Sequence, residues 1–113
     1  MPFINSKVTV KLDKKKRDDL AREYGKAISI MGKPESYLML GFEDETPLYM
    51  GGRELEKGAM ITVEALGDIR SDAADRMTAA ICDILERNLE IPGNNVYVTY
   101  QGFRDWGHNG RNF

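Results

Sequence analysis

The chain has 113 residues, of which 42% are hydrophobic and 30% charged, and a formal net charge of −2. This length suits a single domain over residues 1–113, and the balanced charge excludes the strongly basic surface typical of nucleic-acid binders. No apolar run approaches the roughly 20 residues of a membrane span, no signal-peptide pattern is visible, and Cys82 as the sole cysteine excludes an internal disulfide or a CxxC motif.

Pro2 follows Met1 directly and opens an extended apolar stretch, which predicts a strand over residues 3–10. Methionine aminopeptidases generally remove a methionine that precedes so small a residue. The mature chain would then begin with a secondary amine, whereas every other amino acid offers only a primary α-amine. Pro2 is therefore a candidate catalytic base, although many chains begin Met-Pro without using it.

The next segment has the pattern of an amphipathic helix. Asp13 can cap its first turn, and Gly32 followed by Lys33-Pro34 is typical of a helix end. Its apolar positions recur at near-helical spacing: Leu20, Tyr24, Ile28 and Met31. The basic run 14–17 is followed at once by two aspartates, so we interpret it as a solvated helix face.

Further along, apolar runs predict strands at residues 37–43, 59–66 and 95–101, with a short strand at 48–50 and turns at 44–47 and 51–52. Ser71 or Asp72 can cap a second helix, which Pro92-Gly93 ends. The apolar face of this helix comprises Met77, Ile81, Ile84, Leu85 and Leu89. Cys82 lies within this helical pattern, so we expect a buried, unreactive thiol.

The strand–helix–strand order occurs twice, and a proline precedes the second strand of each unit. We therefore predict an α+β fold built from a duplicated β-α-β unit, with one four-stranded mixed sheet and two helices on one of its faces. The alternation within the strands assigns a helix-covered face: Leu38, Leu40, Phe42, Ile61, Val63, Ala65, Val96 and Val98. The opposite face is a mixture of apolar and polar residues: Tyr37, Met39, Gly41, Met60, Thr62, Glu64, Leu66, Tyr97, Thr99 and Gln101. Because such a mixed face suits a subunit interface, we predict an oligomer.

Residues 102–113 hold both Trp106 and His108, the only tryptophan and histidine, and an Asn109-Gly110 pair that favours a tight turn. A disordered tail would be poor in aromatic residues, so we expect this segment to dock, across a neighbouring subunit. His108 has no carboxylate partner at a diagnostic spacing, and we assign it no catalytic role.

Several short motifs occur in one order along the chain: Pro2, Gly32-Lys33-Pro34, Gly51-Gly52, Leu66-Gly67, Val96-Tyr97-Val98 and Trp106-Gly107…Asn112-Phe113. In these motifs the chain resembles, over its whole length, the macrophage migration inhibitory factor and D-dopachrome tautomerase family of the tautomerase superfamily. The resemblance implies a homotrimer of β-α-β-β-α-β subunits with active sites at the subunit boundaries. It also implies cofactor-independent keto–enol tautomerisation of phenylpyruvate-like α-keto acids, or of dopachrome.

The resemblance also implies a role for each matching residue. Pro2 would be the general base, and Lys33 the cation beside it. Leu66 stands where the family usually has an isoleucine whose backbone helps to hold the substrate. Tyr97 would come from the adjacent subunit, and Tyr37 and Trp106 would close the mouth of the pocket.

Three departures from the family pattern bear on function. Thr99 replaces a frequent asparagine of the pocket, which bears on substrate preference. Residues 57–61 lack the CxxC segment of the mammalian cytokine, so a thiol-oxidoreductase activity does not transfer. The loop at residues 53–56 is slightly longer than in the family.

The chemistry of the reaction is consistent with these residues. Burial of Pro2 among aromatic side chains and a nearby Lys33 would both lower the pKa of its amine, and a base works best when its pKa lies near the working pH. Taken singly, each residue has a plainer interpretation. Lys33 could be a surface lysine at a helix end, and Tyr37, Tyr97 and Trp106 could simply pack.

Other functions remain open at this level. A different Pro2-dependent reaction, such as hydration or dehalogenation, would require a further acid–base or arginine group, for which Arg104 and Glu64 are candidates. A cytokine-like protein with vestigial tautomerase activity would bind a receptor that nothing in the sequence identifies. We expect a cytoplasmic protein, with secretion lacking a signal peptide as an alternative, and no metal, organic cofactor, nucleic acid or membrane partner.

Overall fold

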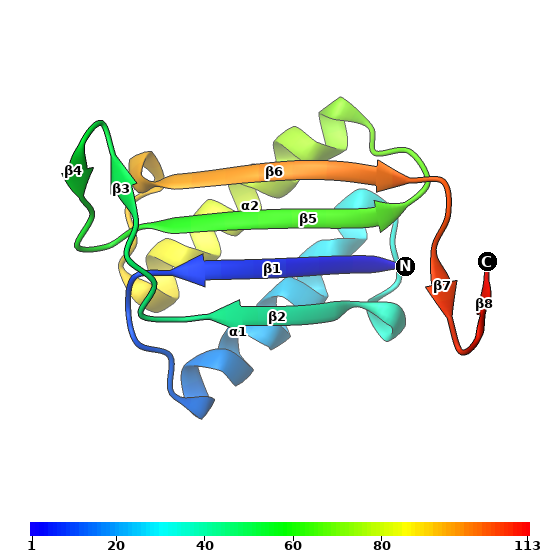
Figure 1. Ribbon diagram of the computed structural model, residues 1–113, viewed down its shortest axis with the longest axis horizontal. Helices are drawn as coiled ribbons and strands as arrows, with labels where there is room; N and C mark the ends of the chain where they lie inside the picture. Colours follow the sequence, from blue (N-terminus) through cyan, green and yellow to red (C-terminus); the bar gives the residue numbers. More distant parts are fainter.

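One mixed four-stranded sheet organises the computed structural model, which describes residues 1–113 (Figure 1). Its strands are β1 (Pro2–Val8), β2 (Met39–Glu43), β5 (Ala59–Leu66) and β6 (Val96–Phe103), in the order β2-β1-β5-β6. Strand β1 runs parallel to β2, and β5 parallel to β6, whereas the central strands β1 and β5 are antiparallel. The parallel pairs are the two β-α-β units, so the predicted fold is confirmed.

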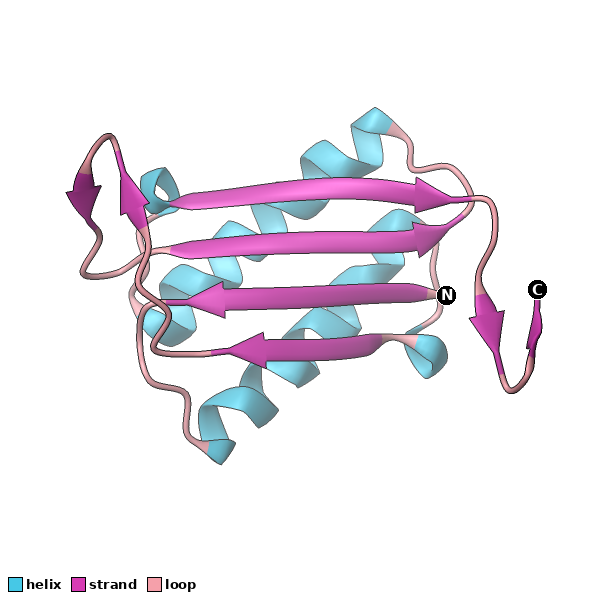
Figure 2. Cartoon of the chain, in the orientation of Figure 1, coloured by secondary structure: helices cyan, strands magenta, loops and turns pink.

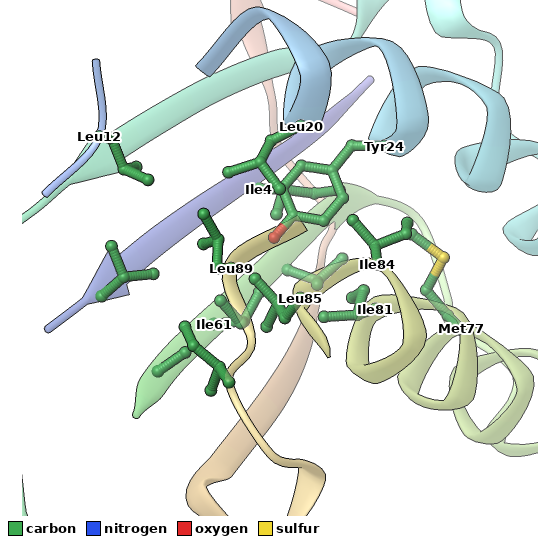
Figure 3. Close-up of a cluster of buried hydrophobic side chains, with 14 of the residues drawn as sticks. Ile4, Leu12, Leu20, Tyr24, Ile61, Met77, Ile81, Ile84, Leu85 and Leu89 are labelled. Carbon is green, nitrogen blue, oxygen red and sulfur yellow. The ribbon is translucent and has the colours of Figure 1, made fainter. Parts of the chain in front are cut away.

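Both long helices, α1 (Lys14–Ala27) and α2 (Ser71–Leu89), cover the same face of the sheet (Figure 2). The core lies between helices and sheet, where side chains from all these layers interlock (Figure 3). Ile4 and Ile61 from the strands, with Met77 and Ile81 from α2, are fully buried. Each such side chain contributes about 1.5–3 kcal/mol by its removal from water, so this core holds the sheet against the helices.

The first helix begins where the sequence predicts, because the Asp13 carboxylate accepts a hydrogen bond from the backbone N–H of Lys16 at 2.8 Å. The basic run is solvated, as expected, and pairs with acidic residues one turn later, as in Lys14–Asp18 at 2.7 Å. The expected last turn is not α-helical. Ile28–Met31 form a 3-10 helix, which ends at Gly32 with a φ of 69°.

Several predicted boundaries are wrong by a few residues. The second strand was expected from residue 37, but Glu35–Tyr37 form a 3-10 helix after Pro34, and β2 begins at Met39. This tight turn redirects the chain from the end of the first helical segment into the sheet. The first strand ends at Val8, and Ser71 is the first residue of α2 rather than its cap, which is Arg70. Cys82 is half-buried rather than buried.

Two small hairpins lie at opposite ends of the sheet (Figure 1). Strand β3 (Tyr49–Met50) pairs with β4 (Arg53–Glu54) around the expected glycine turn, and β7 (Gly107–His108) pairs with β8 (Arg111–Asn112). The second hairpin turns at Asn109 and Gly110, whose φ angles of 51° and 88° suit an Asn-Gly pair. It lies beyond the end of the sheet where the chain begins and where β5 and β6 finish.

The other face of the sheet carries no helix (Figure 1). The predicted alternation is confirmed in β5, where Ala59, Ile61, Val63 and Ala65 are buried and the residues between them are partly exposed. Large apolar side chains remain exposed at Met39 and Tyr97, with 68% and 63% of their surface accessible. Neither long helix is apolar enough over a sufficient length to span a membrane.

Candidate functional site

The start of β1 is fixed at one end of the sheet. Pro2 is buried and pairs with Ala65 of β5. The backbone N–H of Leu66 donates a hydrogen bond to the Met1 carbonyl at 3.0 Å, and that of Gly67 donates to Phe103 at 2.7 Å. The beginning of the chain and the carboxyl ends of β5 and β6 therefore form one hydrogen-bonded unit.

Lys33 reaches this unit from the turn that follows the first helical segment. Its ammonium donates a hydrogen bond to the Leu66 carbonyl at 2.9 Å. No carboxylate pairs with Lys33, although lysines elsewhere in the chain have such partners, as Lys57 does with Glu90. The structure therefore brings Lys33, Leu66 and Pro2 together, with a positive charge that is free to attract an anion.

A cavity of about 380 Å³ opens beside Pro2. Most of its lining is apolar or aromatic, and the side chains that matter here are Pro2, Tyr37, Met39, Trp106, His108 and Phe113. Tyr37 lies in the 3-10 helix that precedes β2, and Trp106 lies just before β7. Both aromatic residues predicted to close the pocket thus line it within one chain.

The C-terminal segment docks through aromatic contacts with its own chain. Trp106 contacts Phe103 edge-on at 5.9 Å between ring centroids, and Phe113 donates a backbone hydrogen bond to Trp106 at 3.0 Å. The rings of His108 and Phe113 stack at 5.7 Å with an interplanar angle of 5°, and Tyr37 meets the His108 ring edge-on at 6.0 Å. The expected docking is confirmed within the chain, where the segment packs on Tyr37, and its contact with a neighbouring subunit stays a prediction.

His108 and Phe113 are cavity residues that sequence reasoning missed. The available signal was the Asn109-Gly110 turn, because a tight hairpin folds the last residues back onto those that precede the turn. The hairpin packs against Tyr37, which is far from it in the sequence. The residues of the hairpin therefore do not indicate where it lies relative to the sheet.

The electrostatics of the site disfavour a second positive charge. Burial, and then the nearby Lys33, hold the pKa of the Met1 α-amine below its ordinary value of 8.0. None of the residues that line the cavity is an aspartate or a glutamate. An amine at this end of the sheet therefore loses its proton more readily than an amine in water does.

Two predicted site residues, Tyr97 and Thr99, lie in β6 at a distance from the Pro2 cavity. Tyr97 pairs with Met60 and Thr99 with Thr62, whereas Pro2 pairs with Ala65. At about 3.3 Å per residue along a strand, Tyr97 is roughly 17 Å and Thr99 roughly 10 Å from the Pro2 level. Both are exposed on the uncovered face of the sheet, so one chain does not bring them to the cavity.

The residues considered for other Pro2-dependent reactions also lie outside this cavity. Arg104 is exposed and pairs with the adjacent Asp105 at 2.9 Å. Glu64 lies between Phe3 and Gln101 in the sheet. No group of three or more His, Cys, Asp and Glu side chains is arranged to hold a metal ion.

Known proteins resemble this chain in sequence and in fold. The family model described as macrophage migration inhibitory factor (MIF) matches residues 1–113. The macrophage migration inhibitory factor of Xenopus laevis is 29% identical over 97 residues, which cover 84% of this chain and 81% of that protein.

Solved structures agree with the sequence comparison. The crystal structure of Leishmania major MIF2 has a TM-score of 0.94 and 34% identity, and the match covers 100% of this chain and 97% of that one. The macrophage migration inhibitory factor of Toxoplasma gondii has a TM-score of 0.88 and 28% identity, with 98% and 99% covered.

Proposed function

Because the chain belongs to the macrophage migration inhibitory factor family, within the tautomerase superfamily, we propose that it is a cofactor-independent keto–enol tautomerase of phenylpyruvate-like α-keto acids, with dopachrome as a related substrate. The observation that carries the proposal is the convergence of the start of β1 with the unpaired Lys33 ammonium, beside a cavity lined by Tyr37 and Trp106.

The base in this proposal is the secondary amine that Pro2 acquires when Met1 is removed. Pro2 is buried at this end of the sheet, and Lys33 lies close enough to lower the pKa of the amine of the preceding residue. The same two causes would lower the pKa of a Pro2 amine and so increase its uncharged fraction. An uncharged amine with a pKa near the working pH is an effective general base.

The substrate would bind with its carboxylate at Lys33 and its aromatic ring against Tyr37 and Trp106. The Pro2 nitrogen takes a proton from the carbon next to the keto group, and the electrons of that C–H bond form the C=C bond of the enol. The carbonyl oxygen becomes an enolate oxygen and receives a proton in turn. Backbone groups around Leu66, which already hydrogen-bond Lys33 and Met1, would orient the substrate.

The remaining pocket residues belong, in this proposal, to a second copy of the chain. Tyr97 and Thr99 are exposed on the uncovered sheet face, which has the mixed character of an interface. A homotrimer formed through these faces would bring the Tyr97 and Thr99 of one subunit to the Pro2 of the next, with active sites at the subunit boundaries.

The decisive experiment uses protein whose intact mass shows that Met1 has been removed. We expect it to tautomerise phenylpyruvate, and Pro2→Gly to lower kcat/KM by about a hundredfold or more, the usual scale of general-base catalysis. A glycine-serine extension ahead of Pro2 converts its amine to an amide and should have the same effect without disrupting the oligomer. Full turnover by the extended protein would refute the proposed base.

Hydration and dehalogenation of 3-haloacrylates are the alternatives on the same scaffold. Apart from His108 and the Tyr37 phenol, no acid–base side chain lines the Pro2 cavity of this chain, and no arginine does. A substrate panel with phenylpyruvate and 3-haloacrylates distinguishes the reactions directly.

A further inference from the structure

Two of the polar side chains of the β7–β8 hairpin, His108 and Arg111, can carry a positive charge, and the proposed tautomerisation uses neither. His108 lies directly opposite Arg111 in the hairpin register. Residues directly opposite each other on antiparallel strands project to the same face. The tight turn at Asn109 and Gly110 therefore holds an imidazole and a guanidinium side by side.

His108 lies between two cavities. One is the cavity that Pro2 lines, and the other, of about 410 Å³, is lined by residues of the hairpin, among them His108, Arg111 and Phe113. The stack of His108 on Phe113 forms the wall that the two cavities share, and Tyr37 holds the His108 ring from its edge. Arg111 lines the cavity that adjoins the Pro2 cavity at His108 and Phe113.

The charged side chains along this path favour an anion. No aspartate or glutamate side chain lines either cavity. Arg111 takes part in no ion pair, in contrast to Arg104, which pairs with Asp105, and Arg87, which pairs with Asp83. A guanidinium presents its donors in a planar fork that matches a carboxylate, so the free Arg111 is suited to bind one.

We propose that the β7–β8 hairpin forms a distal subsite for a second carboxylate of the substrate, bound by Arg111 with His108 as a further hydrogen-bonding group. The proposal rests on the proposed function for the first carboxylate, which Lys33 takes. It narrows the substrate class to extended α-keto acids that carry an anionic group at the far end from the keto acid.

Binding tests the subsite without reference to catalysis. Trp106 is the only tryptophan and lines the Pro2 cavity, so its fluorescence reports ligand binding. The probes are 3-(4-carboxyphenyl)propionate and 3-phenylpropionate, which differ only by the distal carboxylate. Because exposed ion pairs contribute modestly, we expect the Kd of the dicarboxylate to be about threefold to tenfold lower in the wild-type protein.

The variants are His108→Phe, which keeps an aromatic ring on Phe113, and Arg111→Gln, which keeps a polar side chain. Each should bring the ratio of the two Kd values closer to one, and the double variant should abolish the preference. Arg53→Gln is the matched control, because Arg53 is an exposed arginine without an ion pair in the β3–β4 hairpin at the other end of the sheet. It should retain the wild-type ratio.

Kinetics give the second readout, as the ratio of kcat/KM for 4-carboxyphenylpyruvate over phenylpyruvate. We expect Arg111→Gln to lower this ratio through KM rather than kcat. Equal wild-type affinity for the two probes, or a preference that survives in the double variant, would overturn the subsite. A preference that depends on Arg111 in a protein that turns over neither keto acid would support the subsite and refute the tautomerase proposal.

Discussion

At the residue scale, Lys33 is the most informative side chain, because its ammonium has no acidic partner and donates a hydrogen bond to the Leu66 carbonyl, beside the start of the chain. Its charge is one of two causes that lower the pKa of the α-amine there. The same lysine would attract the substrate carboxylate, so its removal should affect both the base and substrate binding.

Replacement of Lys33 by glutamine should therefore shift the pH profile. A base is active when it is deprotonated, so kcat/KM rises as pH increases through its pKa. Without the lysine charge that pKa is higher, and the acid limb of kcat/KM should move to higher pH, with a larger KM for phenylpyruvate. Profiles of wild type, Lys33→Gln and the control Lys57→Gln test this, and an unmoved acid limb in Lys33→Gln would show that the lysine does not act on the base.

Also at this scale, Tyr24 is a polar group inside the core (Figure 3). Its hydroxyl and that of Ser6 are 3.1 Å apart, and both residues are fully buried. Tyr24→Phe leaves the Ser6 hydroxyl without a partner, so we expect a loss of about 1–3 kcal/mol in the free energy of unfolding, measured in urea. The double variant Ser6→Ala/Tyr24→Phe should recover part of that loss, and no recovery would mean that packing, rather than the hydrogen bond, dominates.

The same tyrosine affects alkaline stability. Burial raises the pKa of Tyr24 from 10.0 to about 12. The pKa of Tyr24 is therefore higher in the folded than in the unfolded state. Its contribution to the free energy of unfolding is fully present below pH 10 and is lost as pH rises toward about 12. Tyr24→Phe should remove this part of the alkaline decline.

At the scale of elements, the site depends on a close approach between the end of β6 and the turn after β5. A Cβ atom at Gly102 would collide with the backbone carbonyl oxygen of Gly67. The Gly67 N–H also donates to Phe103 at 2.7 Å, so the turn has little room to move. A side chain at Gly102 must therefore displace the segment that carries the Leu66 carbonyl.

Accordingly, Gly102→Ala should lower the free energy of unfolding by about 1–3 kcal/mol, the cost of overpacking, and should reduce tautomerase activity. Gly93→Ala is the matched control, because the nearest atom to its added Cβ lies at 4.0 Å and its φ is not positive. Urea denaturation and phenylpyruvate turnover of both variants provide the measurement. If the two variants had equal free energies of unfolding, the turn after β5 would be able to move aside without destabilising the protein.

At the scale of the whole molecule, one chain carries an incomplete version of the proposed site. Pro2 and Lys33 lie at one end of the sheet, and Tyr97 is near the other, on the face without helices. If the site forms between subunits, chains with different defects should complement one another.

Pro2→Gly and Tyr97→Ala chains should each be weakly active alone and more active when co-assembled. In randomly mixed rings, about a quarter of the sites combine an intact Pro2 with an intact Tyr97 from the neighbour. Phenylpyruvate turnover by the co-expressed, size-selected oligomer measures this gain. Activity no higher than the average of the two parents would place Tyr97 outside the neighbouring site.

Local patterns in the sequence determined the elements of this protein. Alternation over residues 59–66 assigned the two faces of β5, and helical spacing from Leu20 to Ile28 identified the buried side of α1 and of the 3-10 turn that follows it, because burial on one face imposes the period of the element. The family resemblance, which rests on motifs such as Gly32-Lys33-Pro34, predicted five site residues that the structure brings to one end of the sheet. They are Pro2, Lys33, Tyr37, Leu66 and Trp106.

Only the tertiary structure decided three other features. It placed Tyr37 in a 3-10 turn instead of a strand, it brought His108 to the cavity, and it separated Tyr97 from Pro2 within the chain. The last two depend on contacts between residues that are distant in the sequence. The period of a strand shows which side of the sheet a residue occupies, but its position along the sheet is set by strand register, and the position of the final hairpin by packing against Tyr37.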